Sequence, residues 1–453
     1  MTSQCKADVQ TASAESVSLR GRDRYRRIAR SALAALSQKF LTVTLGLVTV
    51  PVTINYLGKE QFGLWMLITS LVSWLQLSDV GVTGGLLNSI AEADGKDERE
   101  KISRYIKAAL LFLSGVAGVV GVLAFIAAPL IPWSSVLSTD DATILNLAPY
   151  TFMASAAMYL ITLPLTVAAT TLRALQRGYI ADWILTSGAV ISALLLFLAV
   201  YAKLSVPYLV IAQSSGQLLA AMVMICMLAR YVDNLSWSNL EFDKAVFRRV
   251  AHSSVPLVLL QVGGLLVNEL IAVIVAQTES LRAVSDYYLL QRIYIFILTV
   301  GGGLILGFYP ALREAFERHD YQWVKIATVR MIAIRVGGVT LVGLSLIFVG
   351  NYAIETVFGQ ALDEPFTTFG WLALIFCLSM NSLNTTLSDI MSRLDDIWFQ
   401  VVLVAITAVL VLTGLWHMIP WFGLPGIYIL MGGVTLPPII VCSIRLMRKL
   451  NVK

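Results

Sequence analysis

Apolar segments of roughly 20 residues recur along almost the whole chain, and this repetition restricts the fold more than any other feature. A helix that rises 1.5 Å per residue needs about that length to cross the ~30 Å hydrocarbon core of a bilayer. Only 13% of the 453 residues are charged and 57% are hydrophobic, whereas soluble domains are about 25% charged. The sequence therefore predicts a polytopic, all-α membrane protein without a sizeable soluble domain.

About twelve transmembrane helices are expected, because strand-like alternation is missing and helices satisfy the backbone in lipid. Their ranges are 33–56, 62–88, 107–133, 146–170, 182–202, 206–230, 252–277, 285–311, 326–350, 366–390, 398–417 and 422–444. The polar segment 231–251 divides these ranges into two halves. The expected parts are a basic N-terminal tail (1–32), a six-helix lobe (33–230), a linker (231–251), a second six-helix lobe (252–446) and a basic C-terminal tail (447–453).

Basic residues set the expected orientation, because Lys and Arg near helix ends are retained in the cytoplasm. With the N-terminus inside, the outer connections hold only Lys59, Lys203 and Arg282. Both termini are then cytoplasmic, and we expect a multi-pass protein of the cell inner membrane. The arginine-rich run before the first span is interpreted as an anchor on anionic lipid, with recognition of a ligand head group as the alternative.

The sequence indicates no metal, nucleotide or disulfide site. The three histidines, His252, His319 and His417, have no ligand spacing, and the four cysteines are too scattered for a disulfide framework. A GxxxxGK[ST] loop is missing. The glycine triplet 301–303 lies inside a span, where small residues favour helix packing. We expect no cofactor, no metal and no nucleic-acid partner.

Ionisable residues inside spans are the first candidates for function, because each costs several kcal/mol unless it faces protein or water. Glu269 and Arg292 each lie roughly 11 Å from the outer ends of two antiparallel spans, so the spacing allows an ion pair. That pair is either structural or a switch, in which Glu269 takes a proton or cation while Arg292 engages phosphate. Arg335 lies near the midplane, where it either faces a water-filled cavity or pairs with an acidic residue of another helix.

The other charged residues near span ends also allow two interpretations. Asp79 and Asp389 lie near the cytoplasmic ends of two spans, and Arg173 and Arg177 lie just beyond a third. These residues either cap and anchor helices or form an inner gate. Lys39 lies in the first span, where its long stem either reaches the interface or lines a cavity.

A sequence pattern in the first hairpin adds a family resemblance. Tyr56 begins YLGKEQFGLW, and LQLSDVGVTGGLLNSIAEA follows. This pattern resembles the polysaccharide transporter family, the O-antigen and lipid-linked oligosaccharide flippases of the multidrug/oligosaccharidyl-lipid/polysaccharide exporter superfamily. That family similarly carries a Tyr-Leu-Gly turn, an aromatic-Gly-Leu-Trp helix start and an Asp-x-Gly, which Asp79 and Gly81 match here. The segment LRALQRGYIADW also resembles a turn of the family, whereas Glu269 stands where many relatives have Asp.

The resemblance implies two six-helix lobes around a central cavity. It also implies a flippase, not an enzyme, that moves an undecaprenyl-diphosphate-linked oligosaccharide to the outer leaflet by alternating access, in surface or exopolysaccharide biosynthesis, with proton or cation coupling as an option. Expected partners are that lipid-linked oligosaccharide, membrane lipids, a polysaccharide polymerase and its chain-length machinery. The candidate residues are Arg292, Arg335 and Lys39 for substrate binding, and Glu269, Asp79, Asp389, Arg173 and Arg177 for coupling or gating.

Two other functions remain open from the sequence. One is a cation antiporter of the multidrug and toxin exporter type, which belongs to the same superfamily and favours acidic cavity residues. The other is a membrane glycosyltransferase or polymerase, which would be expected to carry acidic catalytic residues on a substantial outer loop. The short outer connections and the midplane Arg335 favour a transporter of an anionic substrate over both.

Overall fold

A computed structural model of the chain describes the backbone of residues 2–79, 81–228, 230–232, 255–305, 308–317, 320–358, 362–393 and 398–451. Side chains are described from Ala34 onward, apart from some near the gaps. The side chains of the arginine-rich run, and most of the predicted linker 231–251, lie outside the described residues.

The described residues form helices and connecting turns, with no strand among them. The first half contains α1 (Thr2–Ser73), the 3-10 helix η1 (Trp74–Asp79), α2 (Val82–Gly95), α3 (Arg99–Ala127), α4 (Trp133–Leu137), α5 (Ala142–Ala174), α6 (Gly178–Tyr201) and α7 (Val206–Leu228). The second half contains α9 (Val255–Asn268), α10 (Leu270–Thr278), α11 (Leu281–Ile305), α12 (Phe308–Glu317), α13 (Tyr321–Phe358), α14 (Thr368–Arg393), α15 (Trp398–Phe422), α16 (Leu424–Gly433) and α17 (Leu436–Asn451).

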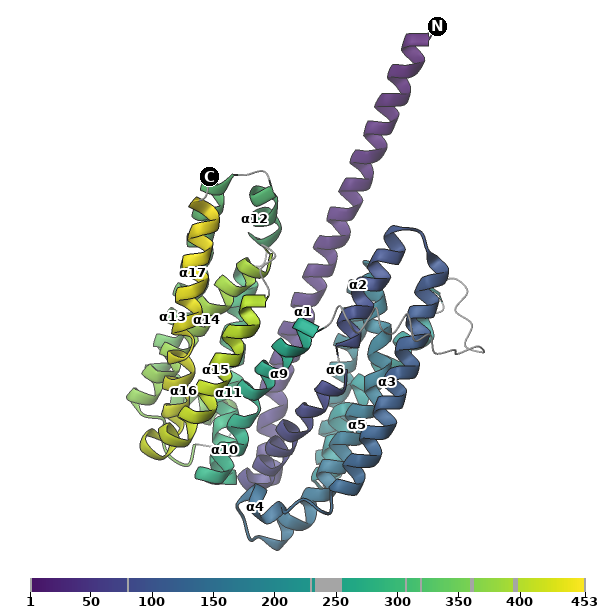
Figure 1. Ribbon diagram of the computed structural model, residues 1–453. Coiled ribbons are helices and arrows are strands. Elements are labelled where there is room, and N and C mark those ends of the chain that lie inside the picture. The colour runs from purple at the N-terminus through teal and green to yellow at the C-terminus, as the bar shows by residue number, and fades with distance from the viewer. Residues whose placement is uncertain are drawn as a thin grey trace.

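Ten helical segments of the described chain are long and apolar enough to cross a membrane. Two features explain the difference from the predicted twelve. Predicted spans 33–56 and 62–88 fall in one segment, Leu36–Asp79, which turns at Gly58, where φ is 74°. Figure 1 shows the chain descending from the N-terminus to this turn and returning towards α2. The predicted span 366–390 corresponds to α14, which carries many polar side chains. The all-helical, multi-pass fold is confirmed, while the side on which the termini lie stays a prediction.

One predicted span is interrupted rather than continuous. The helix expected over 62–88 ends at Ser73, passes through η1 and restarts as α2 after Gly81, whose φ of 71° is left-handed. Such a break exposes backbone polar groups, which are tolerated in a membrane only where protein or water covers them. The helices α9 and α10, by contrast, meet at Glu269, which keeps helical φ and ψ, and together they form one membrane-crossing segment, as do α16 and α17.

The two halves form lobes that share a core at one end only. We name the end that carries both termini the terminal end and the opposite end the distal end (Figure 1). At the distal end, Phe62 of the first lobe and Val284 of the second belong to one continuous apolar cluster. Towards the terminal end, Leu86 belongs to a cluster of the first lobe and Leu387 to a separate cluster of the second. The lobes therefore share an apolar core distally and have separate cores towards the terminal end, where α1 and α11 still lie in contact at Leu36 and Gly303.

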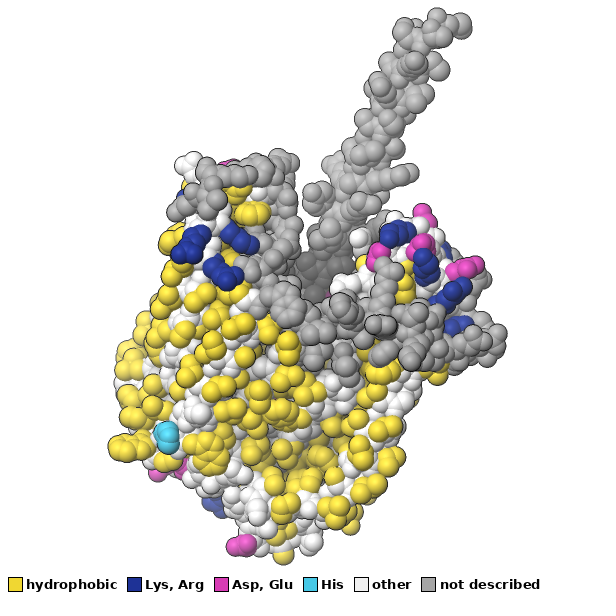
Figure 2. All heavy atoms as spheres, viewed as in Figure 1, with side chains coloured by type: hydrophobic (Ala, Val, Ile, Leu, Met, Phe, Trp, Pro, Cys, Tyr) yellow, Lys and Arg dark blue, Asp and Glu magenta, His cyan; other side chains and the backbone are white. Residues whose placement is uncertain are grey.

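The outer surface of the helices is largely apolar, as contact with a lipid bilayer requires. Large apolar side chains such as Val119, Leu123, Leu198, Leu341 and Phe348 are exposed. Figure 2 shows apolar side chains covering the middle of the visible face, with charged side chains gathered near the terminal end. A soluble monomer rarely exposes so large an apolar surface, so this surface fits contact with lipid.

Candidate functional site

Arg292 lies in the contact between the two lobes. Its helix, α11, packs side by side with α1, and the Phe40 and Phe296 rings of these helices are 6.1 Å apart. Gly46 of α1 leaves room for the guanidinium, because a Cβ at Gly46 would lie 3.4 Å from Arg292 Nη1. The Arg292 Nε is buried and has no hydrogen-bond partner. Among the described side chains, no carboxylate forms an ion pair with Arg292.

Glu269 also lies at the contact between the lobes, at the residue where α9 meets α10. The Ser70 hydroxyl on α1 donates to the Glu269 carbonyl oxygen, and the Ser70 and Ser73 hydroxyls lie beside the Glu269 carboxyl. Tyr288, one turn before Arg292 on α11, lies beside both Glu269 and Arg292. The structure thus brings both charged groups beside one tyrosine, but the ion pair that the depth argument allowed between them is not formed within the described structure.

Arg335 is paired, which decides between the two alternatives for this residue. Its Nη1 lies 3.7 Å from Asp389 Oδ2 on α14 and 3.4 Å from Thr386 Oγ1. The Tyr309 hydroxyl donates to the same Asp389 oxygen at 2.8 Å. Of the two alternatives for Arg335, the structure has the pair with an acidic residue of another helix, supplied by α14, while a role of Arg335 in substrate binding stays a prediction. Gly302 of α11 lies against this guanidinium, as expected for a glycine that allows close packing.

Asp79 caps a helix. Its Oδ1 accepts a hydrogen bond from the Thr83 backbone N–H at 3.2 Å, and its Oδ2 accepts one from the Thr83 hydroxyl. Gly81 lies between them in a left-handed conformation that favours glycine. The Asp-x-Gly sequence is thereby explained as the start of α2. Lys39 has an exposed side chain on α1, and seven residues, two full turns, separate it from Gly46, so both lie on one face of α1.

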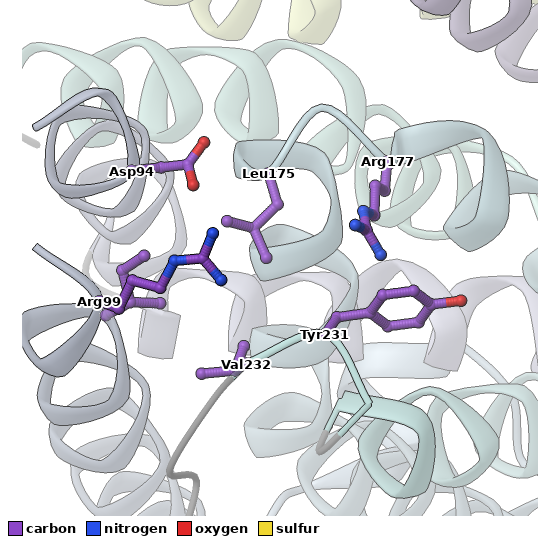
Figure 3. Close-up of a pocket in the computed structure, with 7 residues that line it drawn as sticks. Asp94, Arg99, Leu175, Arg177, Tyr231 and Val232 are labelled. Carbon is purple, nitrogen blue, oxygen red and sulfur yellow. The ribbon is translucent and has the colours of Figure 1, made fainter. Parts of the chain in front are cut away.

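Arg173 and Arg177 lie within the first lobe, away from Asp389. Arg173 forms a 2.9 Å ion pair with the buried Asp182, and the Arg177 guanidinium lies 4.5 Å from the centre of the Tyr231 ring. Figure 3 shows Arg177 and Tyr231 on one side of a pocket, with Asp94 and Arg99 on the other. Because each partner belongs to the first lobe, the structure does not bring the predicted inner-gate residues together. Their role in gating stays a prediction.

The uncharged polar residues of α14 were not chosen as candidates from the sequence. Asn381, Asn384 and Ser388 line a cavity of about 200 Å³, together with Asn268 of α9 and Gln400 of α15. Their spacing of three and four residues places them on one helical face, and this signal could have identified them. Amides and hydroxyls offer hydrogen bonds without charge, so this lining suits neutral polar groups. Among the described residues, no three His, Cys, Asp or Glu side chains are grouped as metal ligands.

Comparison with known proteins gives one family match, one curated relative and two solved structures with a similar fold. The family model described as "Polysaccharide biosynthesis protein" matches residues 28–316. A candidate O-antigen transporter of Salmonella typhi is 22% identical over 415 residues, which are 88% of this chain and 92% of that protein. Among solved structures, an inward-facing multidrug resistance MATE family transporter of the MOP superfamily has a TM-score of 0.67 at 15% identity, over 93% of this chain and 98% of the other. An outward-facing one has a TM-score of 0.64 at 13% identity, over 95% and 96%. The structural likenesses show a shared two-lobed fold.

Proposed function

This chain belongs to the family of polysaccharide biosynthesis proteins, and we propose that it is a flippase for a polyprenyl-diphosphate-linked oligosaccharide. In this proposal the two lobes alternately open a cavity to each leaflet, as repeat-built transporters do. The substrate moves from the cytoplasmic to the outer leaflet of the inner membrane. A polysaccharide polymerase with its chain-length machinery would then use the product, and the covalent structure of the substrate is unchanged.

The observation that carries the proposal is the guanidinium of Arg292, which lies between the lobes without an ionic partner in the described structure. A charged group in a membrane protein is costly unless another charge or water compensates it. A diphosphate has the reverse difficulty, because it loses its hydration when it leaves water. A planar guanidinium suits phosphate oxygens through two parallel hydrogen bonds. Arg292 and a lipid diphosphate would therefore each supply what the other lacks.

The proposed substrate path opens along the contact of α1 with α11, on the side where the two apolar cores are separate. Arg292 lies on α11 where this helix contacts α1, and the two cores become separate towards the terminal end. The polyprenyl tail can stay in lipid while the head group passes between the lobes. The exposed Lys39, two turns from Gly46 on one face of α1, would attract the phosphates on their way to Arg292. The amide-lined cavity of the second lobe would then hydrogen-bond sugar hydroxyls.

A second candidate function, export of organic cations, is favoured by Glu269. Its carboxyl lies beside two serine hydroxyls, and no cationic side chain of the described chain pairs with it. A carboxylate at the contact between the lobes is what a cation-binding exporter requires. Glu269 fits equally well as the group that couples a proton or cation to the flipping step.

Transport by the purified protein in liposomes distinguishes these functions. One assay follows undecaprenyl-diphosphate N-acetylglucosamine between leaflets, and the other follows ethidium. We expect the protein to accelerate movement of the lipid-linked sugar without changing it chemically, and to leave ethidium where it was added. Movement of ethidium without movement of the sugar lipid would favour the exporter, and elongation of the sugar lipid would favour an enzyme.

Replacing Glu269 with glutamine is expected to impair transport much more than membrane insertion. The amide keeps the size and most hydrogen bonds of the carboxyl but cannot take up a proton or hold a cation. The measurement compares the flipping rate in liposomes with the yield of folded protein on size-exclusion chromatography. Glu355→Gln, at a residue near the end of α13, is a suitable control, with both quantities expected to match wild type. An unchanged flipping rate in Glu269→Gln would remove the coupling role.

A further inference from the structure

The turn of the first hairpin carries charges that pair across the lobes at the distal end. Lys59 Nζ lies 2.8 Å from Asp286 Oδ1 and 2.7 Å from Asp363 Oδ1. On the neighbouring residue, Glu60 Oε1 lies 2.9 Å from Arg282 Nη2. Lys59 and Glu60 belong to the first lobe, and their three partners belong to the second. We call these five residues the distal clamp.

The backbone holds the clamp in register. Gly58 takes a left-handed φ of 74° and makes the turn possible. The Ser285 hydroxyl donates to the Lys59 carbonyl oxygen, and the Asp363 backbone N–H donates to Asp286 Oδ2 at 3.0 Å. These hydrogen bonds fix the backbone on both sides of the clamp, at Lys59 and at Asp363. The ion pairs therefore do not depend on long, freely moving side chains.

Burial separates the strong part of the clamp from the weak part. The Lys59 and Asp286 side chains are only 11% and 6% exposed, whereas those of Arg282 and Glu60 are 59% and 42% exposed. Buried ion pairs are costly to break singly, while exposed pairs contribute little. The Asp363 side chain is 47% exposed, so the buried pair of Lys59 with Asp286 is the part that must separate before the distal ends of the lobes can move apart.

We infer that the distal clamp is the outer gate of the transport path, closed in this structure, and that the Tyr-Leu-Gly-Lys-Glu turn exists to form it. This inference rests on the proposed flippase function, because a gate needs lobes that rock. The clamp also gives the exit a direction. A cavity of the second lobe beside it is lined by Glu279, Asp286, Asp363 and Glu364. Once Lys59 withdraws, these carboxylates repel a diphosphate and favour its release.

Accessibility of a cysteine at Ser285 tests the gate without any substrate. Ser285 is fully buried under the turn, so a cysteine there reacts with a membrane-impermeant maleimide only when the clamp parts. Ser285→Cys is made in a chain whose four native cysteines are replaced by serine. Intact cells are labelled from outside. We expect Lys59→Met to accelerate labelling by about tenfold, as loss of a largely buried pair should.

Matched variants separate a gate from general loosening. Lys59→Arg keeps the charge and should label as slowly as wild type, as should Lys203→Met, which removes a distal lysine outside the clamp. Asp286→Asn should also accelerate labelling, and the double variant should be no faster than Lys59→Met, because Lys59→Met already removes the pair with Asp286. Equal labelling in Lys59→Met and wild type, or acceleration that simply adds in the double variant, would overturn the gate. Labelling only from the cytoplasmic side would also overturn it.

The labelling experiment can fail or succeed independently of the flipping experiment that tests the proposed function. Fast labelling of Lys59→Met together with no flipping by the wild-type protein would keep the clamp as a conformational gate and remove the lipid-linked substrate. Unchanged labelling together with active flipping by wild type would remove the clamp and keep the flippase.

Discussion

Arg292→Ala is expected to abolish flipping of a lipid-linked diphosphate, with a rate at least about 100-fold below wild type, because hydrogen bonds to a charged group contribute roughly 1.5–3 kcal/mol each. The variant should still insert and fold. Arg292 forms no ion pair with a carboxylate in the described part of the chain, so removing it leaves no buried acid without a partner. The flipping rate in liposomes and the melting temperature in detergent check the two halves of this prediction.

Two variants sharpen the comparison at Arg292. Arg292→Lys keeps the charge but loses the planar fork, so an intermediate rate is expected. Arg104→Gln removes an exposed arginine whose nearest acidic group, on Glu100, is 3.9 Å away, and it should flip at the wild-type rate. A wild-type rate in Arg292→Ala would contradict the assigned role. A large fall in melting temperature would instead make Arg292 a structural residue.

Gly63→Ala is expected to destabilise the protein more than any other conservative change discussed. A Cβ at Gly63 would overlap the carbonyl oxygen of Leu281 and lie 3.0 Å from the Ser285 hydroxyl oxygen. The Leu281 carbonyl belongs to the backbone and cannot rotate away. The part of α1 that follows the turn at Gly58 must therefore move away from α11. Overpacking typically costs 1–3 kcal/mol, and we expect about 3 kcal/mol or more at this site. The measurement is the melting temperature and the yield of monodisperse protein.

Gly115→Ala provides the matched control for this change. Gly115 lies within α3, and a Cβ there would have no heavy atom within 4 Å. Alanine is the better helix former by about 1 kcal/mol in a helix interior, so this variant should be as stable as wild type or more stable. Equal loss of stability in Gly63→Ala and Gly115→Ala would show that close packing of α1 on α11 is not the cause.

Hydropathy predicted most of the fold because lipid imposes one requirement on every span. Apolar length located most of the helices, while the linker predicted over 231–251 lies mostly outside the described residues and stays a prediction. The interruption was missed for a physical reason. The helix predicted over 62–88 breaks at η1 and Gly81, where a left-handed glycine and the Asp79 cap replace helical hydrogen bonds. Hydropathy averages over such a local change, although the Asp-x-Gly sequence carries the signal for it.

The sequence predicted how deep the candidate residues lie along their helices, but not which way their side chains point. A rise of 1.5 Å per residue placed Glu269 and Arg292 at similar depth, and both do lie beside Tyr288. Whether two groups face each other depends on helix rotation and crossing, which packing decides. For the same reason the partner of Arg335 could not be named, although Asp389 was already a candidate. The distal clamp was also missed, because it joins residues more than 200 positions apart.

A cryo-electron-microscopy structure in nanodiscs that contain undecaprenyl diphosphate tests the role of Arg292 most directly. We expect a phosphate oxygen within hydrogen-bond distance of the Arg292 guanidinium, at about 2.7–3.2 Å, with the polyprenyl chain extending into lipid. A phosphate bound elsewhere, with Arg292 paired to Glu269 or pointing at acyl chains, would contradict the account.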